Sequence, residues 1–142
     1  MVRRLKVYFI HSTKMDYNNL LYRFILSSSV CLNHELMLPQ TNKYQDKYVR
    51  DLLAKADIVI ADVSNPTFGL KLELKWALKS KKPIKYISLD NTISKKIKKL
   101  VPEIDMITDD NSLIKIIENF IEHYAGMTKE EQEDPTMVLG EL

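Results

Sequence analysis

The feature that most constrains the fold is a run of four apolar residues, 58–61, that lies between Asp57 and Asp62. Its small and β-branched side chains are typical of a strand buried on both faces, as in a parallel sheet. The strand leads into a turn that contains proline and glycine, 64–69, and then into a helical pattern that carries Glu73. Because ligands of open parallel sheets collect beyond the carboxyl ends of the strands, we expect the functional site at this turn.

The rest of the chain alternates between strand-like and helix-like patterns. Short apolar segments predict strands at 5–10, 35–38, 58–61, 84–89 and 104–107. Helical spacing predicts helices at 17–29 after a cap at Asp16, at 43–55, at 68–81, at 94–100, and after a cap at Asp110 or Asn111. Parallel neighbours need a crossover, which a helix supplies. The pattern therefore predicts an α/β, flavodoxin/Rossmann-like three-layer sandwich with a five-stranded parallel sheet in the order 2-1-3-4-5.

Composition limits the function classes. With 142 residues, 45% of them hydrophobic, the chain suits one compact domain, expected at 1–125, followed by an acidic tail or arm at 126–142. A net charge of +2 is too small to indicate a nucleic-acid partner, and the lysine run at 95–99 is typical of a solvated helix face. The single Cys31 cannot form an internal disulfide, and no apolar run suggests a signal segment or a membrane span. We expect a cytoplasmic protein with no membrane contact.

Two polar turns should meet at the edge of this sheet. The first and third strands are neighbours in the predicted order, so the turns that follow them face each other. Hydroxyls, a cation and backbone N–H groups there could hold an anion such as a phosphate. The side chains concerned are Ser12, Lys14, Ser64, Thr67 and Gly69. The alternative is that Lys14 is an ordinary surface lysine and that one glycine carries no functional meaning.

The histidines do not indicate a metal site. His34 and His123 have no partner at metal-ligand spacing, so we expect no metal and no cofactor. His11, at the end of the first strand, could be an acid–base group or simply a hydrogen-bonded turn residue.

Glu73 is the candidate for chemistry. We expect it near the start of its helix, partly shielded from water by Phe9, Phe68 and Trp76. A carboxyl group in such a place either titrates high as an acid or acts as a nucleophile toward an electrophilic carbon. The alternative is that the carboxylate only favours the positive end of the helix.

Two motifs support a family resemblance. The sequence ADIVIADVSNPTFG at 56–69, followed by Glu73, Leu74 and Ala77, resembles the signature of the nucleoside 2-deoxyribosyltransferase superfamily. The first strand ends in YFIHSTK at 8–14, where the 2′-deoxynucleoside 5′-phosphate N-hydrolases of that superfamily have Tyr-Phe-x-Gly-Ser-x-Arg. The likeness covers about residues 5–124.

The resemblance implies a role for each matched position. Glu73 stands in the place of the nucleophile that attacks C1′ of the sugar and forms a covalent glycosyl intermediate as the base leaves. Tyr8 matches a tyrosine that lies against the sugar and the nucleophile. Ser94 resembles a serine that the neighbouring subunit lends to the phosphate, which implies a homodimer. The positions that match the 5′-phosphate group are Ser12, Lys14, Thr67 and Gly69, with lysine in place of arginine.

Three positions depart from the family pattern. His11 replaces a glycine, which either narrows the pocket or adds a group that can hydrogen-bond the ligand, and Lys71 replaces a second glycine. Val49 stands where the family has a second carboxylate, and Asp51 is displaced from that position by about 200° around a helix. The general acid is therefore open. The candidates are Asp46, Asp51, His11 and Asp62, the last of which could equally be a strand-end residue that caps its turn.

The main hypothesis is an enzyme that cleaves, or transfers, the N-glycosidic bond of a 2′-deoxynucleoside 5′-monophosphate with Glu73 as nucleophile. The loss of the second carboxylate at Val49 motivates a different class, a non-catalytic nucleotide-sensing module. A third is a TIR-like domain that cleaves NAD or joins signalling assemblies, since those domains share the sheet order. Base specificity would come from side chains around 41–48, with Gln40, Thr41 and Asn42 as plausible donors, and no motif identifies the base.

Overall fold

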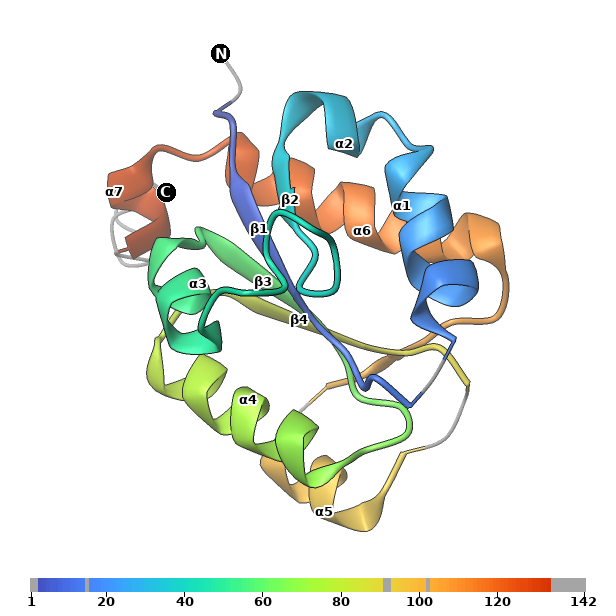
Figure 1. Cartoon of the computed structure of the whole chain (residues 1–142). Helices are drawn as coiled ribbons and strands as arrows, with labels where there is room; N and C mark the ends of the chain where they lie inside the picture. Colours follow the sequence, from blue (N-terminus) through green and yellow to red (C-terminus); the bar gives the residue numbers. More distant parts are fainter. Residues whose placement is uncertain (1–2, 15, 91–92, 102, 134–142) are drawn as a thin grey trace.

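The computed structural model describes residues 3–14, 16–90, 93–101 and 103–133. Its centre is a five-stranded sheet in the order β2-β1-β3-β4-β5, with every neighbouring pair parallel. This confirms the predicted sheet order (Figure 1). The strands are β1 (Lys6–Ile10), β2 (Glu35–Met37), β3 (Ile58–Asp62), β4 (Ile84–Ser88) and β5 (Asp105–Met106).

Helices cover both faces of the sheet. Figure 1 shows α1, α2 and α6 above it and α3, α4 and α5 below it. The helical segments are η1 (Asn18–Tyr22), α1 (Arg23–Leu26), α2 (Val30–Asn33), α3 (Val49–Lys55), α4 (Phe68–Lys79), α5 (Lys95–Leu100), α6 (Asp110–Ala125) and α7 (Lys129–Glu133). No helix in the described ranges is long and apolar enough to cross a membrane.

Strand β1 supplies side chains to two separate cores because successive residues of a strand point to opposite faces. Val7 and Phe9 pack with α1 and α6, whereas Tyr8 and Ile10 pack with α3 and α4. All five residues of β3 are buried, as expected for the central strand of a parallel sheet. Tyr8 therefore lies on the same side of the sheet as α4, the helix that carries Glu73.

Two predicted helices are shorter or more broken than their apolar spacing indicated. Residues 17–29 form the π-turn η1 and the single turn α1, and the chain then turns again into α2, which the spacing did not reveal. Ser27 and Ser28 donate their hydroxyls to the carbonyls of Phe24 and Ile25, so these side chains compete with the helical backbone pattern. Residues 43–48 form turns, and the helix predicted from residue 43 begins only at Val49.

Helix α6 shows why a cap is hard to place from sequence. Asp109, not Asp110 or Asn111, is the N-cap: its carboxylate accepts the backbone N–H of Ser112, whose hydroxyl hydrogen-bonds back to the backbone of Asp109. Three adjacent residues can each cap a helix, and the register of the apolar stripe on the core selects one of them.

The described part of the tail predicted at 126–142 packs against the rest of the chain. Gln132 in α7 accepts a hydrogen bond from Arg3 at 2.5 Å and donates one to the carbonyl of Asp57 at 2.7 Å. These bonds tie α7 to the amino ends of β1 and β3. The remainder of the predicted tail, 134–142, lies outside the described residues.

Candidate functional site

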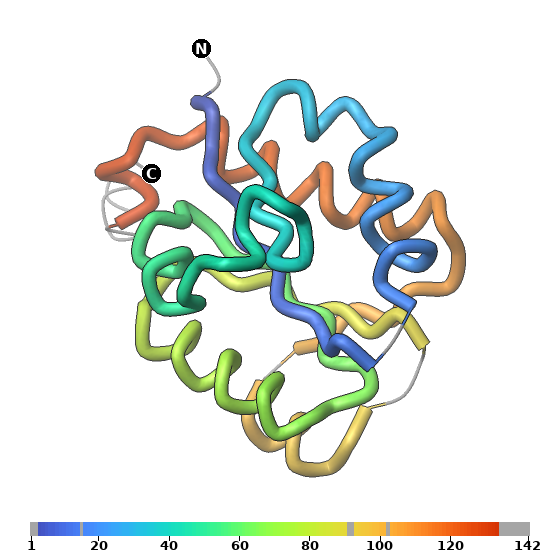
Figure 2. Tube along the Cα trace, in the orientation of Figure 1, coloured from blue at the N-terminus to red at the C-terminus, as the bar shows by residue number. Residues whose placement is uncertain are grey.

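The site was predicted at the carboxyl ends of β1 and β3. The two strands pair in register from Val7 with Ile58 to Ile10 with Ala61, so the turns that follow them start side by side. The chain leaves β1 toward η1 and α1 on one face and leaves β3 toward α4 on the other, as Figure 2 shows. A crevice between neighbouring strands whose connections diverge is the usual ligand position in this fold.

Glu73 lies in this region and contacts Tyr8. The Tyr8 hydroxyl donates a hydrogen bond to Oε1 of Glu73 at 3.3 Å. Burial raises the pKa of the Glu73 carboxyl to about 7, against the hydrogen bond from Tyr8, which lowers it. Burial, together with the nearby Glu73, also raises the pKa of the Tyr8 hydroxyl, so this hydroxyl stays protonated and acts as a donor. The two side chains thus form a hydrogen-bonded pair of a phenol and a carboxyl group whose pKa lies near neutrality.

The position of Glu73 on its helix argues against the alternative that its carboxylate only favours the positive end of the helix. Glu73 is the sixth residue of α4, and the first turn of α4 holds no acidic residue. The field of a helix end falls off within the first turn, so it offers little stabilisation at this position. Two of the residues expected to shield Glu73 do not do so as predicted, since Phe9 belongs to the opposite core and Phe68 is 83% exposed. Phe9 has the wrong strand parity, and Phe68 is the first residue of the helix and points outward.

The turn after β1 contains a buried hydroxyl and an exposed cation. Ser12 is buried and its Oγ accepts the backbone N–H of Lys14 at 3.1 Å, which leaves its hydroxyl hydrogen available as a donor. The Lys14 side chain is exposed. His11 is 4% exposed, and both of its ring nitrogens have protein partners: the carbonyl of Ser12 at 3.1 Å and the hydroxyl of Tyr22 at 2.6 Å. A ligand could bond His11 only by displacing one of them.

The turn after β3 is built around Asp62. Its buried carboxylate accepts hydrogen bonds from the backbone N–H and hydroxyl of Ser64 and from the backbone N–H of Leu89. Burial raises the pKa of Asp62 to about 6, and these hydrogen bonds oppose that rise. With its lone pairs directed at the protein, Asp62 holds the turn in shape, which matches the strand-end alternative. Thr67 then caps α4 by accepting the N–H of Leu70 at 3.1 Å.

Gly69 does not need to be glycine for packing. A Cβ at this position would meet only the Thr67 Oγ1, at an ordinary 3.9 Å. The residue lies exposed at the start of α4, where backbone N–H groups lack intrahelical partners.

Two further site candidates are not brought to Glu73 by any contact within the described ranges. Asp51 is exposed in the first turn of α3, and Val49, at the position where the resemblance implied a second carboxylate, packs against the core that contains Tyr8. Ser94 caps α5 by accepting the N–H of Ile97 at 3.1 Å. The roles predicted for these residues remain predictions.

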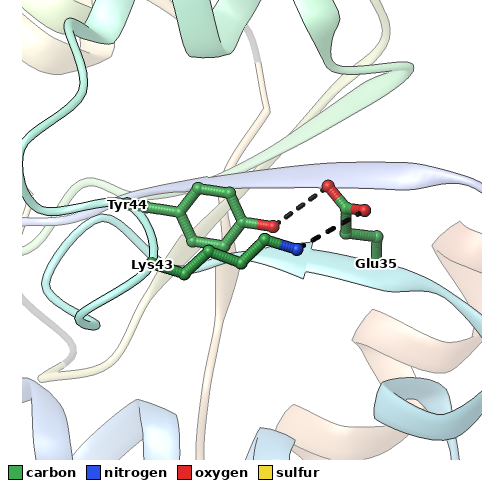
Figure 3. Close-up of polar contacts among 3 residues, drawn as sticks. All are labelled: Glu35, Lys43 and Tyr44. Carbon is green, nitrogen blue, oxygen red and sulfur yellow. Dashed lines mark hydrogen bonds and ion pairs between the residues drawn. The ribbon is translucent and has the colours of Figure 1, made fainter.

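The segment expected to contact the base is a compact loop that folds back on β2. Tyr44 donates its hydroxyl to Oε2 of Glu35 at 3.0 Å, and Lys43 lies 3.9 Å from the other carboxylate oxygen (Figure 3). Burial and the contact with Glu35 raise the pKa of Tyr44 to about 12. Because Glu35 opens β2, this contact holds the far part of the loop near the amino end of the strand.

Sequence reasoning missed Tyr22, which reaches the site from η1. Its hydroxyl bonds His11 and also accepts the backbone N–H of Gln40 at 3.1 Å. The available signal was a tyrosine inside an otherwise apolar stripe, because a buried phenol needs a hydrogen-bond partner. Across the described ranges, no group of three or more His, Cys, Asp or Glu side chains is placed to hold a metal ion.

The chain resembles a known protein in its fold. No protein-family model matches the chain, and no curated protein matches it. Among solved structures, the fold is similar to that described as "Structure of Clostridium botulinum CMP N-glycosidase, BcmB". The TM-score is 0.58 with 16% sequence identity, and the match covers 80% of this chain and 98% of that one. Over four fifths of its length, the chain thus shares its α/β fold with a structure described as a CMP N-glycosidase.

Proposed function

We propose that the protein cleaves, or transfers, the N-glycosidic bond of a nucleoside 5′-monophosphate with Glu73 as the nucleophile. The observation that carries this proposal is the hydrogen bond of 3.3 Å between Tyr8 and Glu73, with the pKa of Glu73 raised to about 7 by burial. A carboxyl group of that kind is suited to reaction with an electrophilic sugar carbon. The fold shared with a CMP N-glycosidase supports the same reaction class.

The reaction would run in two displacements. The ionised carboxylate of Glu73 attacks C1′, the C1′–N bond breaks, and the base departs with the electron pair and takes up a proton. Water, or a second base, then attacks C1′, loses a proton and breaks the ester, which regenerates the carboxylate. The Tyr8 hydroxyl holds the attacking group in place through its hydrogen bond. Neither displacement requires a metal or a cofactor.

The phosphate would be held between the two turns. Ser12 supplies a hydroxyl donor and Lys14 a cation from one turn, while Thr67 and Gly69 supply the start of α4 from the other. Ser94 would come from a second subunit, so the proposal includes a homodimer.

Four groups are candidates for the source of the proton that the departing base takes up: His11, Asp46, Asp51 and Asp62. His11 is buried with both nitrogens engaged, and Asp62 is occupied with its own turn. Asp46 is exposed in the turns before α3, and Asp51 is exposed in the first turn of α3, so each could receive a proton from water, but neither contacts Glu73 within the described residues.

The proposal allows two kinds of substrate, which differ in the sugar. The sequence motifs predict a 2′-deoxynucleotide, whereas the similar structure is described as acting on CMP, a ribonucleotide. A panel of 2′-deoxy- and ribonucleoside 5′-monophosphates, each with its unphosphorylated nucleoside, separates these possibilities. Free base is measured by chromatography, and turnover of nucleotides over nucleosides is the expected result.

The controls test Glu73 directly. Glu73→Ala should abolish base release while Glu103→Gln, a change at an exposed acidic residue, leaves it intact. Base release that survives Glu73→Ala would refute the assignment.

A nucleotide-binding module remains a second candidate because Val49 packs into the core and supplies no carboxylate. Calorimetry with the same panel distinguishes it, since tight binding without base release favours the module. Adding NAD to the panel tests the TIR-like alternative through release of nicotinamide.

A further inference from the structure

A buried polar cluster of His11, Tyr17 and Tyr22 lies beside the proposed site, and the reaction described above gives its two tyrosines no role. His11 and Tyr22 are each 4% exposed, and Tyr17 covers them, with ring centroids 4.8 Å from His11 and 5.1 Å from Tyr22. A cluster so enclosed needs an internal partner for every polar atom, so its hydrogen bonds can be assigned.

The acceptors determine the direction of each bond. The carbonyl of Ser12 can only accept, so Nδ1 of His11 carries the hydrogen and donates it across 3.1 Å. Nε2 of the neutral ring is then an acceptor, and the Tyr22 hydroxyl donates to it at 2.6 Å. The same hydroxyl oxygen accepts the backbone N–H of Gln40 at 3.1 Å. Burial lowers the pKa of His11, which agrees with the neutral ring.

This chain of bonds joins three separate segments: the end of β1, the π-turn η1 and the loop that follows β2. Gln40 comes three residues after Met37, which pairs in register with Tyr8, the partner of Glu73. The bond from Gln40 therefore fixes the loop where it passes the site. The other attachment of the loop, Tyr44 to Glu35, lies toward the amino end of β2 (Figure 3).

The backbone that presents Tyr22 is unusual. In η1 the N–H of Arg23 bonds the carbonyl of Asn18, five residues back, so the turn is wider than an α-helical turn. Such π-turns are rare and occur frequently at functional sites. Tyr22 is the last residue of this turn, and the wider turn sets the position from which its ring reaches both His11 and Gln40.

We infer that Tyr22 is a positioning residue: held by His11, its hydroxyl fixes the loop at Gln40 and so places the wall that determines which nucleobase the Glu73 site accepts. The exposed amide side chains of Gln40 and Asn42, on this loop, have both donors and acceptors to offer a base edge. The specificity role rests on the proposed function. The positioning of the loop does not.

The test compares Tyr22→Phe with Tyr17→Phe. Both remove one hydroxyl from the same aromatic cluster and keep the ring, but within the described residues the Tyr17 hydroxyl makes no hydrogen bond. Amide hydrogen exchange and the NMR titration of His11 are measured first, because neither needs a substrate. In Tyr22→Phe the Gln40 amide should exchange about tenfold faster, and His11 should take up a proton at higher pH, since Nε2 has lost its donor.

Turnover of the nucleotide panel is measured next. Tyr22→Phe should raise KM and reduce discrimination between bases about tenfold, with a smaller change in kcat on the best substrate. Tyr17→Phe should leave all of these values near those of the native protein. Equal Gln40 exchange in the two variants overturns the positioning role even in an active enzyme. Unchanged base discrimination in Tyr22→Phe overturns the specificity role. A native protein without turnover refutes the proposed function, and the specificity role with it, while the exchange result still decides the positioning role.

Discussion

Glu73 is a partly buried carboxyl group, and its raised pKa links pH to stability. In the unfolded chain the group titrates near 4.5, and in the folded protein at about 7. The folded state therefore binds the proton of Glu73 more tightly than the unfolded state does. The stability that the protonated carboxyl contributes is fully present below about pH 4.5 and is lost as the pH rises through about 7. We predict that Glu73→Gln stabilises the protein by about 2 kcal/mol at about pH 8 and has little effect at about pH 4, with partial solvation limiting the gain. Urea unfolding at both pH values measures this, and an equal effect at both would contradict it.

Tyr8 should control the pH at which Glu73 becomes ionised. Its hydroxyl lowers the pKa of Glu73 by donating to the carboxylate. Tyr8→Phe removes that donor, so the pKa of Glu73 should rise by up to about one unit. Because the proposed nucleophile is the ionised carboxylate, the acid limb of the kcat/KM profile should move to higher pH. A uniform loss of activity with no movement of that limb would show that Tyr8 acts on the sugar and not on Glu73.

At the scale of single elements, Lys82 stabilises the end of α3. Its ammonium group donates to three backbone carbonyls there, those of Leu53, of Ala54 at 2.8 Å and of Ala56 at 2.5 Å. Carbonyls at a helix end have no intrahelical partner, and a cation beside them is favourable. We predict that Lys82→Met lowers the free energy of unfolding by about 2 kcal/mol, whereas Lys81→Met, at an exposed side chain, has a negligible effect. Denaturant titration of both variants checks this, and equal losses would contradict it.

The same scale shows what the sequence could and could not reveal. The alternation of apolar strand segments, such as β3, with helical stripes, such as that of α6, was sufficient to predict the sheet order, because parallel neighbours need helical crossovers. Residues 17–29 and 43–55 were misjudged because serine hydroxyls bond the helical carbonyls in one and Tyr44 bonds Glu35 in the other. The motif residues at the two turns could be named from sequence, but the role of Tyr22 could not be, since its partners lie in two other segments.

At the scale of the whole molecule, the amino ends and the carboxyl ends of the strands have different surroundings. At the amino ends of the strands, Arg3 donates hydrogen bonds to the carbonyl of Tyr124 at 3.0 Å and to the side chain of Gln132. Gln132 in turn donates to the carbonyl of Asp57. Both ends of the described chain are therefore held at the amino ends of the strands. The partly buried carboxyl of Glu73 and the polar turns lie toward the carboxyl ends of the strands, so binding of the proposed substrate there need not disturb the contacts of the chain ends.

The proposed sharing of Ser94 between subunits can be tested by complementation. Ser94→Asp preserves the cap on α5 and adds a negative charge that should repel a phosphate. This variant and Glu73→Ala should each be inactive alone. In a mixed dimer, one of the two sites has an intact Glu73 from one subunit and an intact Ser94 from the other. Random mixing should therefore restore about a quarter of native activity, because about half of the dimers are mixed and each has one intact site. If Ser94 serves its own subunit, or if the protein is a monomer, every site keeps a defect and mixing restores nothing.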